Sequence, residues 1–163
     1  MRKADAIPGK IVSLHELLQK KAQWKLLGKT IAFTNGVFDI IHDGHIYSLS
    51  EAAKEADLLI VAINSDASVK RLKGETRPLN NQDSRALHMA ALVMVDAVII
   101  FEEDTPLELI KAILPDVLIK GGDYTIEQVA GAKEVVDNGG RVVINKIIEG
   151  FSTTSIIDKI KGM

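Results

Sequence analysis

Two histidines, His42 and His45, stand three residues apart in a short segment that also contains Gly36 and Gly44. Their ring nitrogens can donate hydrogen bonds, and at this spacing both rings fall on one side if a helix begins here. The first backbone N–H groups of a helix also lack partners within the helix and attract anions. We therefore expect this segment to bind a phosphate group, with the glycines leaving room for its approach.

The residues on either side of this segment have the patterns of a strand and a helix. Thr30 to Phe33 form an apolar run without polar alternation, which predicts a strand buried on both faces of a parallel sheet. Beyond Gly44, apolar residues recur at helical spacing: Ile46, Leu49, Ala53 and Ala56. The segment therefore leads from a central strand to a helix N-terminus, where a phosphate is stabilised.

The histidine pair has other interpretations. A single histidine at a helix start is commonly a cap or a satisfied polar residue, and two at this spacing can ligate zinc. The chain has no cysteine, and the remaining histidines, His15 and His88, fall in segments that are predicted to be unrelated helices. These observations favour phosphate binding over a metal site.

The composition restricts the classes of protein to consider. A chain of 163 residues, 47% hydrophobic and 26% charged, suits one globular domain. A net charge of −2 gives no basic field, which argues against nucleic acid as the main partner. The chain has no cysteine, no apolar run of the ~20 residues that span a membrane, and no apolar signal core after Met1 to Asp5. We therefore expect a cytoplasmic protein that does not insert into membranes.

The rest of the chain alternates between helix and strand patterns. Ser13 to Glu16 form a capping box that opens a helix ending near Gly28, so we assign residues 1–28 to an N-terminal extension and residues 29–163 to the main domain. Further strands are predicted at residues 58–63, 97–101, 116–119 and 141–144. Further helices are predicted at residues 67–72, 83–95, 132–138 and 156–160, and one is capped by Thr105 with Pro106 in its first position. The predicted fold is α/β, a single Rossmann-like, doubly wound parallel sheet of five strands with helices on both faces.

Other polar segments follow predicted strands or precede helices, where ligand loops lie in such sheets. Lys120 to Tyr124 form a glycine-permitted turn after the fourth strand, and Ser152 to Ser155 place four hydroxyls at a helix start, where N-capping accounts for one. Arg85 lies in the first turn of a helix, an unfavourable place for a cation unless it binds an anion. Further cations cluster in a loop that is either a solvated surface or an anion site: Lys70, Arg71, Lys73 and Arg77.

The residues around the histidine pair also carry a resemblance. Asn35 to Asp39, followed by His42 to His45, is similar to the G-x-F-D-x-x-H-x-G-H signature of the cytidylyltransferase-like nucleotidyltransferases. Within that superfamily, three segments most resemble the heptose 1-phosphate adenylyltransferases, the adenylyltransferase half of bacterial ADP-heptose synthase: Gly74 to Pro78, Lys120 to Tyr124 and Gly150 to Thr154. The resemblance runs from about Lys29 to Lys161. Glycerol-3-phosphate cytidylyltransferases carry an arginine where this sequence has Ile147, which counts against that relative.

The resemblance implies an activity. The family transfers AMP from ATP to D-glycero-β-D-manno-heptose 1-phosphate, giving ADP-heptose and pyrophosphate for the lipopolysaccharide core. A sugar-kinase domain is usually fused to it, which 163 residues cannot hold, so we expect a free-standing adenylyltransferase. ATP is then a substrate, and Mg²⁺ bridges its phosphate oxygens with few protein ligands. The expected partners are small molecules only, and a homo-oligomer is left open.

The resemblance also implies roles for individual residues. His42 and His45 would bind the α and β phosphates as catalytic residues, together with Lys70 and Lys73. The expected nucleotide-binding residues are Thr34, Asn35, Gly36, Phe38, Gly44, His45, Asp123, Ser152, Thr153 and Thr154. The expected acceptor-binding residues are Asp39, Arg77, Arg85 and Lys120. No residue is expected to ligate a metal.

Two other functions stay open. The chain could be another small-substrate nucleotidyltransferase, such as a glycerol-3-phosphate cytidylyltransferase, or a non-catalytic nucleotide sensor that kept the fold. The intact histidine pair disfavours the sensor, because binding alone does not require donors placed for a transition state.

Overall fold

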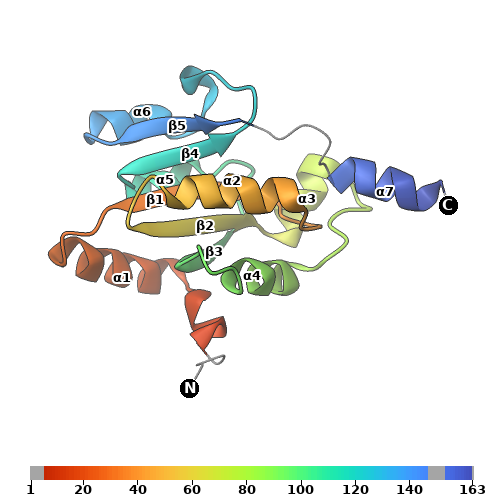
Figure 1. The fold of residues 1–163 in the computed structure, drawn as a ribbon, viewed down its shortest axis with the longest axis horizontal. Coiled ribbons are helices and arrows are strands. Elements are labelled where there is room, and N and C mark those ends of the chain that lie inside the picture. Colours follow the sequence, from red (N-terminus) through yellow and green to blue (C-terminus); the bar gives the residue numbers. More distant parts are fainter. Residues whose placement is uncertain (1–5, 147–152, 163) are drawn as a thin grey trace.

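The computed structural model describes residues 6–146 and 153–162. Its centre is a five-stranded sheet in the order β3-β2-β1-β4-β5, with each pair of neighbouring strands parallel (Figure 1). The strands are β1 (Ile31–Gly36), β2 (Leu58–Asn64), β3 (Ala97–Phe101), β4 (Val117–Gly121) and β5 (Arg141–Asn145). The predicted α/β fold with a five-stranded parallel sheet is confirmed.

Helices cover both faces of the sheet. The α-helices are α1 (Leu14–Leu26), α2 (Asp43–Ala53), α3 (Asp66–Lys73), α4 (Gln82–Ala90), α5 (Leu107–Ile113), α6 (Ala132–Asp137) and α7 (Thr153–Lys161). Two short 3₁₀ helices are η2 (Pro8–Lys10) and η3 (Ile126–Gln128). Helices α2 and α4 pack on one face of the sheet, whereas α1, α5 and α6 pack on the other (Figure 1). None of the described helices is long and apolar enough to cross a membrane.

The central strand β1 is buried on both of its faces. Ile31 and Phe33 belong to the apolar cluster beneath α1, α5 and α6, whereas Ala32 belongs to the cluster beneath α2 and α4. All three side chains have no exposed surface. Because alternate residues of a strand point to opposite faces, only a continuous apolar run can fill both clusters. The run at Thr30 to Phe33 therefore predicts the position of the strand at the centre of the sheet.

Helix α1 begins where its capping box predicts. The Ser13 hydroxyl accepts a hydrogen bond from the Glu16 N–H, and the Glu16 carboxylate accepts one from the Ser13 N–H. The helix packs on the sheet through Leu17, which is fully buried, and Ile11 forms a parallel bridge with Val98. The segment before residue 29 therefore contributes to the core, and the boundary at residues 28 and 29 stays a prediction.

Two predicted helix ends were wrong. Helix α4 ends at Ala90, and residues 91–94 form turns and a bend in place of the predicted helical residues. Val93 is 93% exposed there, so its apolar side chain does not mark a buried helical face. Helix α5 has Pro106 as its N-cap, without a side-chain hydrogen bond from Thr105. In both places the chain must turn towards or away from β3, and this requirement is not visible in the local pattern.

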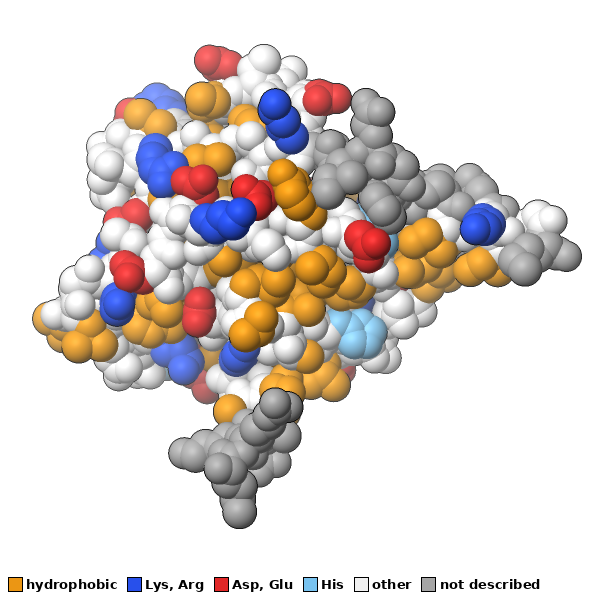
Figure 2. Space-filling model, in the orientation of Figure 1, with side chains coloured by type: hydrophobic (Ala, Val, Ile, Leu, Met, Phe, Trp, Pro, Cys, Tyr) orange, Lys and Arg blue, Asp and Glu red, His pale blue; other side chains and the backbone are white. Residues whose placement is uncertain are grey.

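The surface in the view of Figure 2 carries charges of both signs. Lys and Arg side chains are interspersed with Asp and Glu, without a large area of one sign, in keeping with the net charge of −2. Apolar side chains gather over the α2 and α4 face in this view. The exposed large apolar residues of these two helices include Tyr47 and Leu87. This face of the molecule therefore has an apolar area over α2 and α4 but no large area of a single charge.

Candidate active site

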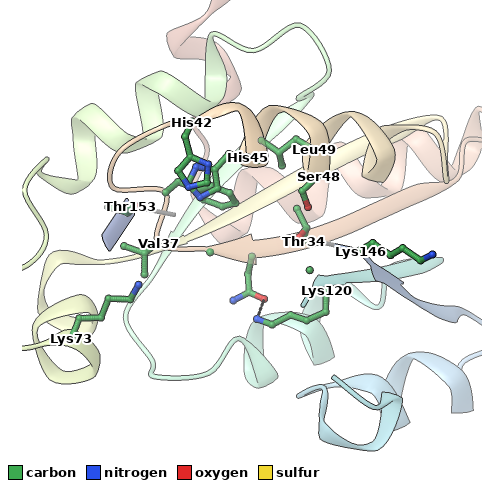
Figure 3. Close-up of a pocket in the computed structure, with 15 residues that line it drawn as sticks. Thr34, Val37, His42, His45, Ser48, Leu49, Lys73, Lys120, Lys146 and Thr153 are labelled. Atoms are coloured by element: carbon green, nitrogen blue, oxygen red, sulfur yellow. Dashed lines mark hydrogen bonds between the residues drawn. The ribbon is translucent and has the colours of Figure 1, made fainter. Parts of the chain in front are cut away.

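A cavity of about 350 Å³ lies at the carboxyl ends of β1 and β4 (Figure 3). Strand β1 has β2 on one side and β4 on the other, so the chain connections run in opposite directions from this point. In open α/β sheets the loops diverge at such a point and leave a crevice for ligands. The cavity lining combines the strand ends with the start of α2: Thr34, Asn35, Gly36, Lys120 and Gly121 with His42, Gly44, His45, Ser48 and Leu49.

The two histidines lie stacked on one side of this cavity. Their ring centroids are 3.8 Å apart with an interplanar angle of 22°. His42 is the N-cap of α2, and its carbonyl accepts the N–H of His45 at 2.8 Å. The edge of the Phe38 ring packs against His45, with centroids 5.2 Å apart. The predicted placement of both rings on one side of a helix start is what the structure shows (Figure 3).

Burial favours the neutral form of both histidine rings. Burial, helped by the nearby His42 ring and the Lys73 ammonium, lowers the pKa of His45 from 6.5 to about 4. Burial also lowers the pKa of His42. A neutral imidazole has one N–H donor and one acceptor nitrogen. The pair therefore offers N–H donors to an anion, and an anion bound beside it would raise both pKa values.

Three lysines line the cavity, and two of them, Lys73 and Lys120, were predicted as site residues. The Lys120 ammonium lies 3.4 Å from the Asn35 side-chain oxygen and 5.6 Å from the centre of the Tyr124 ring. Burial lowers the pKa of Lys120, and burial together with the nearby Arg77 lowers that of Lys73. Within residues 6–146 and 153–162 neither lysine forms an ion pair with a carboxylate. Both are therefore available to pair with a phosphate.

Gly36 is required by a neighbouring side chain. A Cβ at this position would lie 2.9 Å from two carbons of the Phe38 ring, which is closer than packed atoms tolerate. Phe38 itself has a positive φ of 49°, a conformation that costs energy for a residue other than glycine. The glycine thus admits the Phe38 ring, which in turn supports His45. This is a different reason from the room for phosphate that the sequence suggested.

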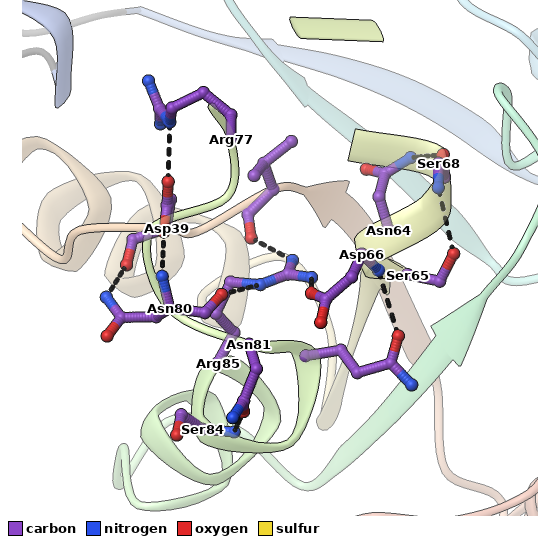
Figure 4. Close-up of polar contacts among 12 residues, drawn as sticks. Asp39, Asn64, Ser65, Asp66, Ser68, Arg77, Asn80, Asn81, Ser84 and Arg85 are labelled. Atoms are coloured by element: carbon purple, nitrogen blue, oxygen red, sulfur yellow. Dashed lines mark hydrogen bonds and ion pairs between the residues drawn. The ribbon is translucent and has the colours of Figure 1, made fainter. Parts of the chain in front are cut away.

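Asp39 holds a loop and does not line the cavity (Figure 4). It is 2% exposed, and its carboxylate accepts hydrogen bonds from Arg77 Nε at 2.8 Å and from the backbone N–H groups of Leu79 and Asn80. Burial by itself raises the pKa of Asp39, but the two N–H groups and Arg77 together lower it. Asp39 and Arg77 bind each other, and Arg77 Nη2 is buried without a hydrogen-bond partner among the described residues, so the predicted contacts of this pair with the acceptor stay a prediction.

Arg85 is also turned towards the protein itself. Its side chain is fully buried and donates to the Val37 carbonyl at 2.8 Å, the Asn80 carbonyl at 3.0 Å and the Asp66 carboxylate at 2.7 Å (Figure 4). The sequence argument that this cation needs an anion therefore holds, but the anion is a carboxylate of the same chain. Its predicted contact with the acceptor phosphate is not supported, since the guanidinium is closed off from the cavity.

The remaining predicted residues divide into three groups. Thr153, at the start of α7, lines the cavity and donates to the Ile40 carbonyl at 3.4 Å. Lys70 and Asp123 are exposed and are not part of the lining. Ser152 and the side chain of Thr154 lie outside the described residues.

Five lining residues were not predicted as site residues: Val37, Ser48, Leu49, Gly121 and Lys146. Helical spacing from His45 would have indicated Ser48 and Leu49, and Lys146 could have been found because it follows the fifth strand. Among the described residues, no group of three or more His, Cys, Asp or Glu side chains could hold a metal ion, so the histidine pair has no third ligand for zinc in this part of the chain.

Comparison with known proteins places the chain in a family. The family model described as cytidylyltransferase-like matches residues 33–159. The chain belongs to the cytidylyltransferase-like family. This membership confirms the predicted superfamily and the prediction of a nucleotidyltransferase enzyme acting on a nucleotide.

Curated relatives are also similar to the chain. It is 54% identical to the Bifunctional protein HldE of Mesorhizobium japonicum over 141 residues, which cover 86% of this chain and 28% of that protein. It is 54% identical to the Bifunctional protein HldE of Klebsiella pneumoniae subsp. pneumoniae over 151 residues, or 93% of this chain and 32% of that protein. The chain thus spans about a third of the length of these relatives.

Two solved structures resemble the fold. The lipopolysaccharide core biosynthesis protein from Thermoplasma volcanium GSS1 has a TM-score of 0.59 and 30% identity, covering 74% of this chain and 98% of that one. The pantoate-beta-alanine ligase from Francisella tularensis has a TM-score of 0.60 with 16% identity, covering 94% of this chain and 78% of that one, and shows the shared fold alone.

Proposed function

We propose that the chain is a cytoplasmic enzyme that transfers AMP from ATP to D-glycero-β-D-manno-heptose 1-phosphate, giving ADP-heptose and pyrophosphate. The observation that carries the proposal is the stacked His42 and His45 pair, which faces Lys73 and Lys120 across one cavity at a helix N-terminus. The identity to part of the HldE proteins supports the choice of substrates, as does the name of the Thermoplasma volcanium structure. The loops that resemble ADP-heptose synthases support the same choice.

The proposed position of ATP follows from the donors of the cavity. Its phosphates lie at the N-terminus of α2, where the ring N–H groups of His42 and His45 and the helix dipole favour negative charge. Lys73, Lys120 and Lys146 line the same cavity and neutralise part of the triphosphate charge. Thr153 lines the cavity at the start of α7, and its hydroxyl would leave the Ile40 carbonyl, 3.4 Å away, to donate to a phosphate.

The proposed chemistry needs positioning and charge stabilisation more than proton transfer. An oxygen of the acceptor phosphate forms a bond to the α-phosphorus of ATP, while the bond from that phosphorus to the bridging oxygen breaks and its electrons leave with pyrophosphate. The acceptor is already an oxyanion at neutral pH, so no general base is required. Negative charge grows on the leaving pyrophosphate, where the imidazole N–H groups and the lysines stabilise it.

Mg²⁺ fits this site as a companion of ATP. No carboxylate occurs among the described residues that line the cavity, so this part of the lining offers no anionic oxygen ligand. This donor set suits an ion held by phosphate oxygens and water, with few protein ligands. When bound, the ion neutralises charge on the triphosphate.

A pyrophosphate-release assay tests the proposal and separates the alternatives. ATP and CTP are each combined with heptose 1-phosphate and with glycerol 3-phosphate, at equal concentrations with Mg²⁺. We expect the highest kcat/KM with ATP and heptose 1-phosphate. A higher value with CTP and glycerol 3-phosphate would identify a cytidylyltransferase. Nucleotide binding by calorimetry without pyrophosphate release from any pair would identify a nucleotide sensor.

A further inference from the structure

A second cavity, of about 410 Å³, lies beside the first at the same edge of the sheet. The residues that line both cavities are Asn35, Gly36, Val37, Lys73 and Lys120. The second cavity is completed by the end of β2, the start of α5 and the segment after β4, which contribute Asn64, Thr105, Tyr124 and Gln128 among others. None of these four residues was predicted from the sequence as a site residue.

We propose that this second cavity binds the sugar phosphate acceptor, and that Tyr124 and Gln128 determine which acceptor fits. The inference rests on the proposed function, because it divides the two substrates of that reaction between two adjoining cavities. Of the acceptor residues predicted from the sequence, only Lys120 lines either cavity, whereas Asp39, Arg77 and Arg85 line neither. The acceptor therefore needs other contacts, and the second cavity supplies them.

The wall shared by the two cavities is where the reacting groups must meet. In-line transfer brings the acceptor oxygen to within about 3–3.5 Å of the α-phosphorus, on the side opposite to the leaving pyrophosphate. His42 and His45 line only the first cavity, so the leaving phosphates belong on that side. Lys73 and Lys120 line both cavities and offset the repulsion between two phosphates at the junction. The acceptor phosphate thus lies at the lysines, with the rest of the acceptor in the second cavity.

The side chains of the second cavity suit a sugar. Tyr124 is 46% exposed and offers a phenol hydroxyl and an aromatic face, which can pack on the C–H face of a sugar ring. Gln128 accepts the Thr125 N–H through its side-chain oxygen at 2.9 Å, which orients its amide and leaves the NH₂ group for a ligand hydroxyl. Asn64 is 4% exposed, and its NH₂ group donates to Ser68 at 3.0 Å, so its oxygen can accept from a second hydroxyl.

The remaining wall adds apolar surface and no competing anion. Leu72 and Pro106 line the cavity and provide apolar contact. Asp104, the one carboxylate among the described lining residues, is paired with Arg71 at 2.8 Å. Fixed polar groups placed among apolar walls are the usual composition of a small-molecule site.

The test uses two conservative variants of the full chain. Tyr124→Phe removes only the hydroxyl and keeps the ring beside Lys120, and Gln128→Glu keeps the oxygen that accepts from Thr125 while removing the NH₂ donor. We expect each variant to raise the KM for the acceptor about tenfold or more and to leave the KM for ATP within about twofold. The matched controls, Tyr47→Phe on α2 and Gln23→Glu on α1, lie outside both cavities and should change neither KM.

The outcomes keep this inference separate from the proposed function. The KM values are measured with whichever nucleotide and acceptor pair the wild-type enzyme uses best, and circular dichroism checks that each variant is folded. A best pair other than ATP and heptose 1-phosphate overturns the proposed function, and the cavity assignment is then judged by the same KM comparison with that pair. A folded variant that raises the nucleotide KM as much as the acceptor KM, or that changes neither, overturns the cavity assignment.

Discussion

Replacement of His45 by glutamine is the sharpest perturbation of the proposed mechanism. The ring is stacked on His42 with centroids 3.8 Å apart, and burial keeps it neutral with a pKa of about 4, so it acts through one N–H donor. Removal of one such donor from a preorganised site lowers kcat by about 10²- to 10³-fold, since the bond matters most where charge develops in the transition state. Glutamine keeps a polar side chain but cannot stack as an aromatic ring, which costs about 1 kcal/mol of stability.

The assay for His45→Gln is steady-state pyrophosphate release with both substrates varied, alongside thermal unfolding. We expect kcat to fall by about 10²-fold or more, the KM for ATP to change much less, and the protein to remain folded. His88→Gln is the matched control, because His88 is exposed on α4 and lines neither cavity. A folded His45→Gln variant with near-normal kcat would refute the assignment of this imidazole to the leaving phosphates.

Three further predictions concern stability and nucleotide binding. The pKa of His45 falls from 6.5 to about 4 on folding, so the unfolded chain binds more protons than the folded protein between these pH values. The free energy of unfolding should therefore decrease as the pH is lowered from about 6.5 to about 4. Urea unfolding should show a smaller pH dependence for His45→Gln than for the wild type. Asp39→Asn should destabilise the protein by about 3 kcal/mol, because it breaks a buried ion pair: the side chains of Asp39 and Arg77 are only 1% and 14% exposed. Urea unfolding should show this loss of free energy. The control Lys133→Ala, which removes an exposed ion pair, should leave the free energy of unfolding unchanged. Thr153→Val should weaken binding of ATP more than of AMP, and equal weakening of both in calorimetry would argue against a contact with the outer phosphates.

The local features of this protein follow from its sequence. The continuous apolar run at Thr30 to Phe33 predicts a central strand because only such a run fills apolar clusters on both faces of a sheet. The spacing of His42 and His45 predicts rings on one side of a helix start, since residues three apart lie on one face of a helix. The capping box at Ser13 likewise predicts the start of α1. Each of these predictions depends on neighbours within about one helical turn or one strand.

The partners of charged residues depend on the tertiary structure. Arg85 needs an anion by its place in the first turn of α4, but the structure alone identifies that anion as Asp66. Arg85 also binds the Val37 carbonyl, which is 48 residues away in the sequence. A buried guanidinium binds whichever acceptors the packed elements bring to it, so the sequence could not distinguish a carboxylate of the chain from a phosphate of the acceptor.

The second cavity likewise exists only in the folded protein. Asn64 ends β2, whereas Tyr124 and Gln128 follow β4, and nothing in either segment indicates the other. They meet because β2 and β4 both pair with β1, one on each side, so that their carboxyl ends open on the same edge of the sheet. Strand order is set by long-range packing, and it decides which distant loops share a cavity. The sequence by itself determined the succession of strands and helices and the histidine-bearing segment between β1 and α2, because those patterns depend on near neighbours.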